Sequence, residues 1–594
     1  MTISSLLADY RQAKRRPSDV VEALHAAQHK SHDSAWICRV GHDALLSRAR
    51  QLEQTARADA RVLSLPLYGI PFAVKDNIDV AGLPTTAACP AFSHVPARSA
   101  RAVEKLEAAG AILIGKTNLD QFATGLNGTR SPYGAVPNAF RPEYISGGSS
   151  SGSAVAVALG EVSFSLGTDT AGSGRVPAGL NNLVGLKPSR GLISARGVVP
   201  ACQSLDCVSV FALSVPDAVS VLETARGFDA EDPWSRELAL SAPLPERFTF
   251  ALPQQLEFHG DAHALHAFNE AVDRLEGLGG KRLAVDFTPY LEAAALLYEG
   301  PWVAERLAAI RPFFERHADE VHPVVRKIIE GAGQYCAADV FCGLTRLEAL
   351  KKVTAPLWNR ADVMLVPTAP SAYTIAELLA EPFLNNRRLG YYTNFVNLLD
   401  LAALAVPAAM RPDGLPSGIT LIAPAGSDLM LAELAQRFHQ LTGLKLGALD
   451  EALPPPQPIG PAADSVRVAV VGAHLSGLPL NHQLTDRGAR LEKAACTSAN
   501  YRLYALPGTV PPKPGMVRDP GRGRAIEVEV WRLPMREYGS FVAGIPSPLG
   551  IGQIELDNGE WVQAFVCESW ALQGAEEISQ LGGWRAYLAQ KAAR

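Results

Sequence analysis

The sequence predicts a large α/β domain followed by a smaller, β-rich α+β domain. Helical and strand patterns alternate along the first three-quarters of the chain, as they do in layered α/β proteins. Residues 451–465 are rich in proline, glycine and alanine, which is typical of an extended linker without a core of its own. The chain also has 594 residues, more than one hydrophobic core usually organises. We therefore expect domains at 1–450 and 466–594, joined by the linker at 451–465.

Several elements of the first domain can be predicted in chain order. Residues 1–21 have the pattern of an amphipathic helix and are too polar for a signal peptide. Residues 99–109 predict a helix with Ser99 as its N-cap. The short apolar runs at 111–114 and 361–367 predict buried strands.

The second domain shows strand patterns. Residues 466–471 form a short apolar run, and residues 524–533 alternate between apolar and polar side chains. Residues 554–565 contain Asn558-Gly559, the favoured pair for a tight hairpin turn. These three segments predict strands in a small β-rich domain.

Composition excludes several classes of function. A net charge of −5 gives no basic field, so we expect no nucleic-acid partner. The eight cysteines lack CxxC spacing, which predicts reduced thiols and no metal site. No apolar run is long enough to span a membrane, so we expect no membrane partner and a cytoplasmic protein.

Two glycine-rich loops carrying serines stand out between residues 147 and 177, and a lysine, Lys75, follows an apolar run upstream. Cleavage of an amide needs a nucleophile, a base and donors for the oxyanion. A lysine serves as the base when burial lowers its pKa to about 7–8. Two alternatives remain: Lys75 pairs with Asp76 or Asp79, or a Ser-His-Asp triad forms from distant residues.

The glycines of the second loop allow backbone conformations that other residues disfavour. Successive N–H groups can then converge on one point, as an oxyanion hole requires. The residues expected to supply them are Thr170, Ala171, Gly172 and Ser173.

These segments resemble the amidase signature family, the Ser–cis-Ser–Lys amidases. Besides residues 147–177, the resemblance rests on LPLYGIPFAVKDN (65–77), GKTNLDQFA (115–123) and VGLKPSRG (184–191). It covers roughly the first three-quarters of the chain. It implies a large twisted mixed β-sheet covered by helices, and an enzyme that works without a cofactor.

The resemblance also assigns roles to three residues. Ser173 matches the nucleophile, Ser149 matches the serine whose preceding peptide bond is cis, and Lys75 matches the base. The implied relay moves a proton from Ser173 through Ser149 to neutral Lys75. Ser150 and Ser151 are the rivals of Ser149 for the bridging role.

A further segment, LYEGPWVAERL at 297–307, resembles the substrate-reading segment of allophanate hydrolases. Pro301 suits the first position of a helix, with Tyr298 just before it and Arg306 between one and two turns in. Arg306 can hold a carboxylate with two parallel N–H bonds, and Tyr298 can donate a third. Gly125 is a candidate for a backbone contact, and the alternative is a plain turn glycine. The alternative for Arg306 is a surface ion pair with a neighbouring glutamate, Glu299 or Glu305.

The second domain resembles the C-terminal domain of allophanate hydrolases, which is related to the γ-glutamylcyclotransferase-like fold. The resemblance rests on residues 468–481 and 504–518. It implies decarboxylation of N-carboxycarbamate. His474, in a glycine-flanked loop after a strand, is the candidate acid–base group, with a purely structural histidine as the alternative. Lys513 and Arg518 are the candidates for holding the anion. The competing role is assembly, as a dimer contact.

Together these features predict hydrolysis of allophanate, a small anionic amide, to ammonia and carbon dioxide. No ATP-binding or biotin-attachment segment occurs in this sequence, so we expect a separate urea carboxylase as functional partner. We also expect the protein to be a homodimer. Alternatives are an amidase for biuret or malonamate, an amidotransferase subunit acting with partners and tRNA, and a non-catalytic scaffold.

Overall fold

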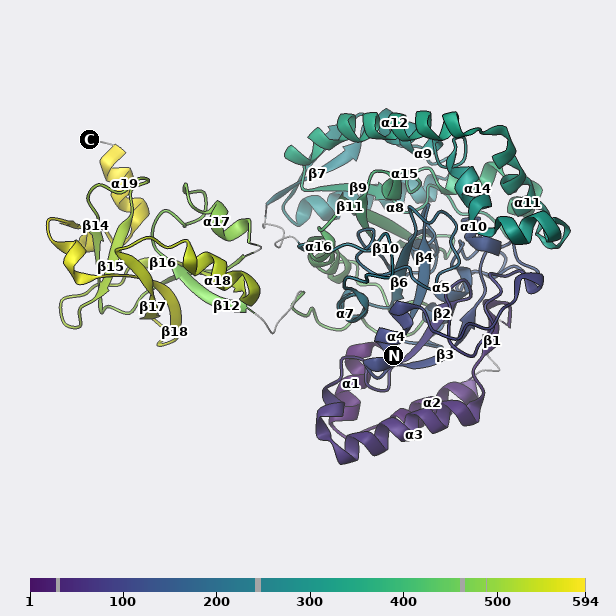
Figure 1. The fold of residues 1–594 in the computed structure, drawn as a ribbon, viewed down its shortest axis with the longest axis horizontal. Coiled ribbons are helices and arrows are strands. Elements are labelled where there is room, and N and C mark those ends of the chain that lie inside the picture. Colours follow the sequence, from purple (N-terminus) through teal and green to yellow (C-terminus); the bar gives the residue numbers. More distant parts are fainter. Residues whose placement is uncertain (28–32, 241–246, 460–464, 488, 593–594) are drawn as a thin grey trace. The chain divides into compact units, whose positions relative to one another are not determined.

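A computed structural model describes residues 1–27, 33–240, 247–459, 465–487 and 489–592. The chain forms two compact units, one of Met1–Leu238 with Leu244–Ile459 and the other of Ala239–Pro243 with Gly460–Arg594 (Figure 1). In the described part of the chain, no helix combines the length and the apolar character needed to cross a bilayer.

The first unit is built around one mixed sheet of eleven strands. Its central strands are buried along their whole length, in agreement with their apolar sequences. In spatial order the strands are β1 (Trp36–Arg39), β3 (Ile112–Thr117), β2 (Pro71–Lys75), β4 (Phe164–Asp169), β6 (Cys207–Ala212), β5 (Val184–Lys187), β10 (Leu401–Met410), β11 (Pro416–Pro424), β9 (Val363–Pro367), β7 (Phe248–Pro253) and β8 (Gly280–Val285).

Strand direction decides where the functional side chains gather. Strands β3, β2 and β4 are parallel neighbours, whereas β6 runs antiparallel to β4. The carboxyl ends of parallel strands meet at one edge of a sheet, and ligand sites of α/β proteins form there. Lys75 ends β2 and Asp169 ends β4, so both lie at this edge.

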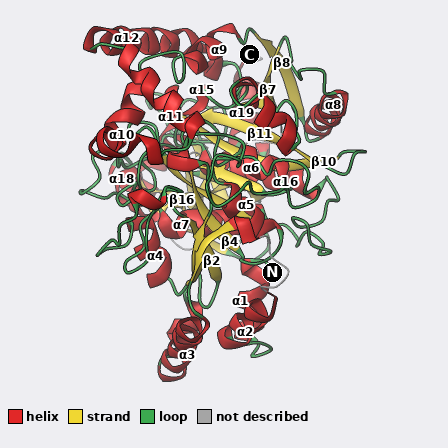
Figure 2. Cartoon of the chain, turned by 90° about the vertical axis from the view of Figure 1, so that its right-hand side faces the viewer, coloured by secondary structure: helices red, strands yellow, loops and turns green. Residues whose placement is uncertain are grey.

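Helices surround the large sheet (Figure 2). Helices α7 and α16 pack together against β6 and β10, and α5 and α6 pack together beside β4 and β11. The helices are α1 (Ile3–Arg11), α2 (Pro17–Ala27), α3 (His42–Ala58), α4 (Arg101–Ala108), α5 (Ser151–Ala158), α6 (Val176–Leu180), α7 (Val215–Ala225), α8 (Ala262–Gly277), α9 (Thr288–Ala295), α10 (Trp302–His317), α11 (Pro323–Glu330), α12 (Ala337–Thr354), α13 (Ile375–Ala380), α14 (Leu384–Leu389), α15 (Phe395–Leu398) and α16 (Asp428–Gln440).

Two details of the predicted helices were wrong. The N-terminal segment forms two helices, α1 and α2, because Pro17 begins a new helix and the chain turns before it. The N-cap of α4 is Ala100, which makes no side-chain cap bond. The hydroxyl of Ser99 instead accepts a hydrogen bond from the N–H of Ala81 at 3.0 Å. The strands predicted at 111–114 and 361–367 are present as β3 and β9.

The predicted linker at 451–465 is partly bound to the first unit. The side chain of Gln440 donates to the carbonyl of Pro454 at 2.8 Å, and Gln436 bonds both backbone groups of Gln457. Helix α16 therefore holds this proline-rich segment. Residues 460–464 lie outside the described residues.

The second unit contains a five-stranded sheet, β13-β16-β12-β18-β17, and a three-stranded sheet, β15-β14-β19. The predicted hairpin is present, with Gly559 at φ +83° in the turn between β17 and β18. The elements are β12 (Ser465–Val470), α17 (His482–Thr485), β13 (Arg490–Cys496), β14 (Tyr501–Ala505), β15 (Pro514–Arg518), β16 (Glu527–Pro534), α18 (Met535–Ala543), β17 (Leu549–Glu555), β18 (Trp561–Cys567), β19 (Glu576–Glu577) and α19 (Trp584–Ala592).

Candidate active site

Lys75 is a fully buried lysine at the carboxyl end of β2. Its amine donates to the hydroxyl oxygen of Ser149 at 2.8 Å and to that of Thr168 at 2.7 Å. Thr168 lies on β4, which pairs in parallel with β2. The strand pairing therefore brings an amine and two hydroxyls together in the interior.

Burial governs the charge of this amine. Removal from water lowers the pKa of Lys75 from 10.5 to about 7, although the carboxylates of Asp120, Asp206 and Asp169 act in the opposite direction. The adjacent Asp76 pairs with a different amine, that of Lys116, at 3.0 Å. Near neutral pH a substantial fraction of Lys75 is therefore uncharged and able to accept a proton.

The three consecutive serines before α5 have different partners. The peptide bond between Gly148 and Ser149 is cis, and the Ser149 hydroxyl contacts Lys75. The hydroxyl of Ser150 donates to the carbonyl of Thr168 at 3.2 Å. The hydroxyl of Ser151 donates to another backbone carbonyl, that of Asn118, at 3.4 Å. Among the three hydroxyls, only that of Ser149 is bonded to the lysine.

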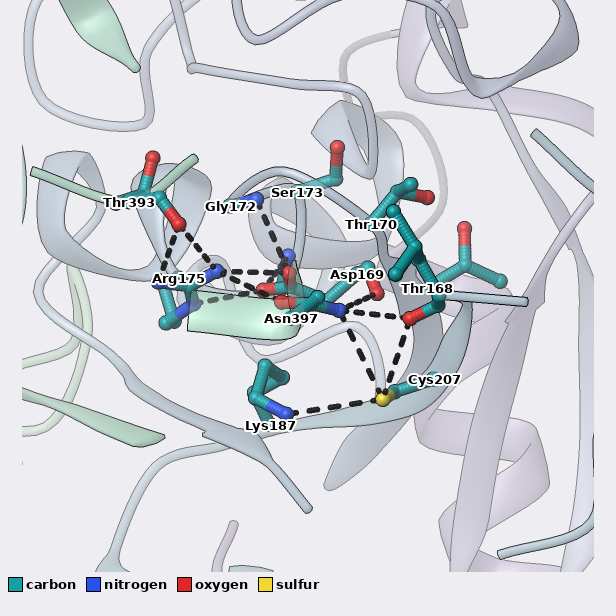
Figure 3. A network of polar contacts seen from close by, with 12 residues as sticks. Thr168, Asp169, Thr170, Gly172, Ser173, Arg175, Lys187, Cys207, Thr393 and Asn397 are labelled. Carbon is teal, nitrogen blue, oxygen red and sulfur yellow. Dashed lines mark hydrogen bonds and ion pairs between the residues drawn. The ribbon is translucent and has the colours of Figure 1, made fainter. Parts of the chain in front are cut away.

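Ser173 lies in the loop between β4 and α6 and is 3% exposed. Its hydroxyl donates to the carbonyl of Gly125 at 3.4 Å. Within the described residues, no hydrogen bond joins the hydroxyls of Ser173 and Ser149. Figure 3 shows the Ser173 side chain directed away from the polar network around Asp169. The structure thus places Gly125 beside Ser173. The hydrogen bond between the Ser173 and Ser149 hydroxyls that the relay requires is not formed among the described residues.

A buried ion pair holds this loop (Figure 3). The guanidinium of Arg175 donates two hydrogen bonds, both of 2.9 Å, to the carboxylate of Asp169, and neither side chain is exposed. Burial alone would raise the pKa of Asp169, but the charge and hydrogen bonds of Arg175 hold it below its usual value. The same carboxylate accepts from the N–H groups of Gly172 and Gly174 at 3.0 Å each.

The hydrogen bonds of the Asp169 carboxylate change the set of backbone N–H groups that can serve as oxyanion donors. Because the N–H of Gly172 donates to Asp169, it is already occupied, contrary to our expectation. The N–H groups of Thr170, Ala171 and Ser173 have no hydrogen-bond partner elsewhere in the described chain. Three backbone donors of the loop are therefore free to bind a ligand.

Arg306 and Tyr298 lie together near the same loop. Arg306, on α10, is 3% exposed and donates to the hydroxyl of Thr124 at 3.1 Å and to that of Tyr298 at 3.4 Å. Its guanidinium also lies 5.0 Å from the centre of the Tyr298 ring. The Nε atom is buried and has no partner among the described residues. Since Thr124 precedes Gly125, Arg306 and Ser173 contact adjacent residues.

The neighbouring glutamates do not pair with Arg306. Glu305 accepts from the backbone and hydroxyl of Ser204 at 2.7 and 2.8 Å. Glu299 pairs with the exposed Arg387 at 3.5 Å. Arg306 is a buried residue, and no ion pair involving it occurs in the described structure.

Sequence reasoning missed three polar residues of the site: Thr168, Thr124 and Asp206. Thr168 could have been found, because it precedes the end of a buried strand that adjoins the strand of Lys75. Burial raises the pKa of Asp206 to about 6, and its carboxylate accepts from the Thr170 hydroxyl. Nothing in the local sequence marks Thr124 or Asp206, since their partners lie far away along the chain.

Comparison with protein family models identifies the family to which the chain belongs. The model of the amidase family matches residues 19–432. The chain belongs to the amidase family. The model of the allophanate hydrolase C-terminal domain matches residues 466–589, so this amidase carries that domain as well. Among the described residues, no cluster of His, Cys, Asp or Glu side chains is suited to hold a metal ion.

Individual relatives extend the similarity of this amidase over both units. The urea amidolyase of Saccharomyces cerevisiae is 46% identical over 94% of this chain and 31% of its own length. The chain thus spans about a third of the length of the urea amidolyases it matches. The crystal structure of Kluyveromyces lactis allophanate hydrolase is 44% identical, with a TM-score of 0.82 over 99% of both chains. That of Kluyveromyces lactis urea amidolyase has a TM-score of 0.83 over 99% of this chain and 37% of the other.

The second unit of this amidase has a mostly apolar cavity of about 260 Å³ that contains His474. His474 contacts the side-chain oxygen of Gln483 through Nε2 at 2.9 Å and stacks on Phe565, with ring centres 5.0 Å apart. Burial lowers the pKa of His474. Lys513 also lines the cavity, whereas Arg518 is not among the lining residues and pairs with a carboxylate, that of Glu555.

Proposed function

We propose that this chain hydrolyses allophanate, with Ser173, Ser149 and Lys75 as its catalytic residues. The observation that carries the proposal is the similarity to Kluyveromyces lactis allophanate hydrolase, which extends over 99% of both chains. The match of the second unit to the allophanate hydrolase C-terminal domain also favours this function over an amidotransferase subunit.

The first half-reaction is acyl transfer to Ser173. Neutral Lys75 takes a proton from Ser149, which takes one from Ser173, and the Ser173 oxygen bonds to the urea carbonyl carbon. The C–N bond to the terminal amino group then breaks, and the relay returns the proton so that ammonia leaves. Water repeats the sequence on the acyl-enzyme and releases N-carboxycarbamate. The Ser173 hydroxyl must first rotate away from Gly125.

The developing oxyanion lies beside the free N–H groups of Thr170, Ala171 and Ser173. Donors held in place before the reaction stabilise such a charge at no cost of reorganisation. Asp169 and Arg175 supply that rigidity, because their bonds fix the backbone between these donors.

Arg306 and Tyr298 bind the carboxylate of the substrate. The buried Nε of Arg306 lacks a partner, and a carboxylate satisfies it while it neutralises the guanidinium. Gly125 lies between this clamp and Ser173, and its carbonyl faces the nucleophile.

The second unit decarboxylates N-carboxycarbamate. His474 is kept neutral by burial in a cavity whose one cationic lining residue is Lys513. Lys513 attracts the anion and His474 exchanges the proton.

Four further parts of the proposal concern the protein as a whole. We relate the second unit to the γ-glutamylcyclotransferase-like fold. We place the protein in the cytoplasm as a homodimer, and we infer that a urea carboxylase activity supplies its substrate.

Replacement of the nucleophile tests the proposal. Ser173→Ala is expected to abolish ammonia release from allophanate, since no other group can form the acyl-enzyme, while circular dichroism and thermal unfolding stay unchanged. Ser93→Ala, at an exposed serine, is the matched control and keeps full activity. Ammonia release by a folded Ser173→Ala protein would refute the assignment.

A further inference from the structure

A tight turn at residues 201–206 touches both parts of the proposed amidase site. The N–H groups of Leu205 and Asp206 donate to the carbonyl of Cys202, at 2.9 Å each. The carboxylate of Asp206 in turn accepts from the N–H groups of Ala201 and Cys202 at 2.8 and 3.3 Å. The turn is thus closed by its own residues, and Asp206 and Cys202 are both buried.

On one side, the turn is fastened to the loop of free N–H groups. The antiparallel register of β4 and β6 pairs Asp169 with Cys207, which places the next residue, Thr170, beside Asp206. The hydroxyl of Thr170 donates to the carboxylate of Asp206 in a buried hydrogen bond. Movement of the turn would therefore move Thr170 and the loop that follows it.

On the other side, the turn is fastened to the first turn of α10. Both oxygens of the Glu305 carboxylate accept hydrogen bonds from Ser204, one from its N–H at 2.7 Å and one from its hydroxyl at 2.8 Å. The thiol of Cys202 also lies 3.7 Å from the carbonyl of Trp302. Because Glu305 precedes Arg306, this contact fixes the part of α10 that carries the guanidinium.

These contacts close a ring. From Ser173 the first path runs through Gly125 and Thr124 to Arg306. The second path returns from Arg306 through Glu305 and the turn to Thr170, in the loop of Ser173. The path through Glu305 and the turn stays closed when the Ser173 hydroxyl rotates away from Gly125 for attack, so it still ties the first turn of α10 to the loop of the nucleophile.

We propose that Glu305 and the turn at 201–206 are positioning elements that set the distance between Arg306 and Ser173. They thereby select amides by the spacing between their carboxylate and their scissile carbonyl. This inference rests on the proposed function, because it takes Arg306 as the carboxylate clamp. A small misplacement of a bound substrate is costly, because attack requires the reacting atoms at about 3–3.5 Å.

Two amides that differ in this spacing test the inference: allophanate, and the longer succinamate. In Glu305→Ala, two hydrogen bonds to a charged acceptor are lost and the bound substrate is misplaced, so kcat/KM for allophanate should fall about 10- to 100-fold, mainly through kcat. Succinamate should lose less, so the ratio of the two kcat/KM values should fall by about tenfold. Glu305→Gln, which still accepts from Ser204, should restore part of the ratio.

The control is Glu315→Ala, on the exposed side of the same helix, where the carboxylate pairs with Arg311 at 2.8 Å. It should leave both substrates unchanged. If Glu305→Ala does not fold, Ser204→Ala removes one of the two bonds and should shift the ratio in the same direction.

An unchanged substrate ratio in a folded Glu305→Ala or Ser204→Ala protein, or an equal loss on both substrates, would overturn the inference. The unsubstituted enzyme reports separately on the proposed function: absence of allophanate turnover refutes that function itself. Turnover by the unsubstituted enzyme with an unchanged ratio in the variants refutes only the positioning role.

Discussion

The hydroxyl oxygen of Thr168 lies 2.7 Å from the amine of Lys75, on the neighbouring parallel strand. A neutral amine has two N–H groups and one lone pair. When Thr168 accepts one of these N–H groups, the lone pair is free to face the hydroxyl of Ser149, from which the proposed relay takes a proton. The orientation of the base is thus set by strand pairing and does not depend on an ion pair.

The lowered pKa of Lys75 predicts the pH dependence of hydrolysis. The base must be neutral, and its pKa is about 7. Below that value kcat/KM should fall about tenfold per pH unit, because the neutral fraction falls at that rate; above it kcat/KM should level off. Initial rates of ammonia release between pH 5.5 and 8.5, corrected for substrate stability, measure this. A flat profile across this range would show that Lys75 is not the base.

Replacement of Arg306 should impair carboxylated substrates selectively. In Arg306→Ala, a substrate carboxylate loses its partner, which costs roughly 2–5 kcal/mol of transition-state stabilisation. The quantity to compare is kcat/KM on allophanate and on a small neutral amide. Arg311→Ala, at an exposed arginine of the same helix, should leave both values unchanged. An equal loss on both amides would contradict the clamp.

The ion pair between Asp169 and Arg175 should be a major source of stability for the first unit. Asp169→Asn leaves a buried guanidinium without its counter-charge, which should lower the free energy of unfolding by about 3–5 kcal/mol. Chemical denaturation, followed by fluorescence, gives this difference. The matched control is Asp59→Asn, which removes an exposed pair with Arg61 and should have no measurable effect. Similar midpoints for the two variants would disprove the prediction.

His474→Ala should separate the two proposed steps. The first ammonia is released by the serine chemistry of the other unit, so its rate should stay within about twofold of the unsubstituted enzyme. Enzymatic release of carbon dioxide should slow by at least about 100-fold, the usual contribution of a general acid–base group. Coupled assays for the two products, with His482→Ala at an exposed histidine as control, measure both. Parallel loss of both products would argue against the division of labour.

The local sequence was enough to find the residues whose role depends on the backbone around them. The apolar run before Lys75 predicted its burial, and the glycines around Ser149 and Ser173 predicted the loops that hold both serines in the interior. The turn at Gly559 was predictable for the same reason, since one residue pair defines it.

Residues whose role depends on distant partners could not be found in this way. Asp206 differs in no local respect from other aspartates, and only the register of β4 and β6 brings it to Thr170. The N–H of Gly172 was expected to be free, but it is bonded to Asp169, whose orientation is fixed by Arg175. Local patterns predict which backbone shapes are possible, whereas tertiary pairing decides which donors remain unused.

The buried pair of Asp169 and Arg175 also affects the proton affinity of Lys75. An isolated carboxylate at the end of β4 would favour a positive charge on the nearby amine of Lys75 and would draw a proton onto it. Because Arg175 holds a positive charge against that carboxylate, it offsets part of this effect on Lys75, while the same hydrogen bonds stiffen the loop. One ion pair therefore serves both the stiffness of the loop and the proton affinity of the base, so a substitution at either partner is expected to change both.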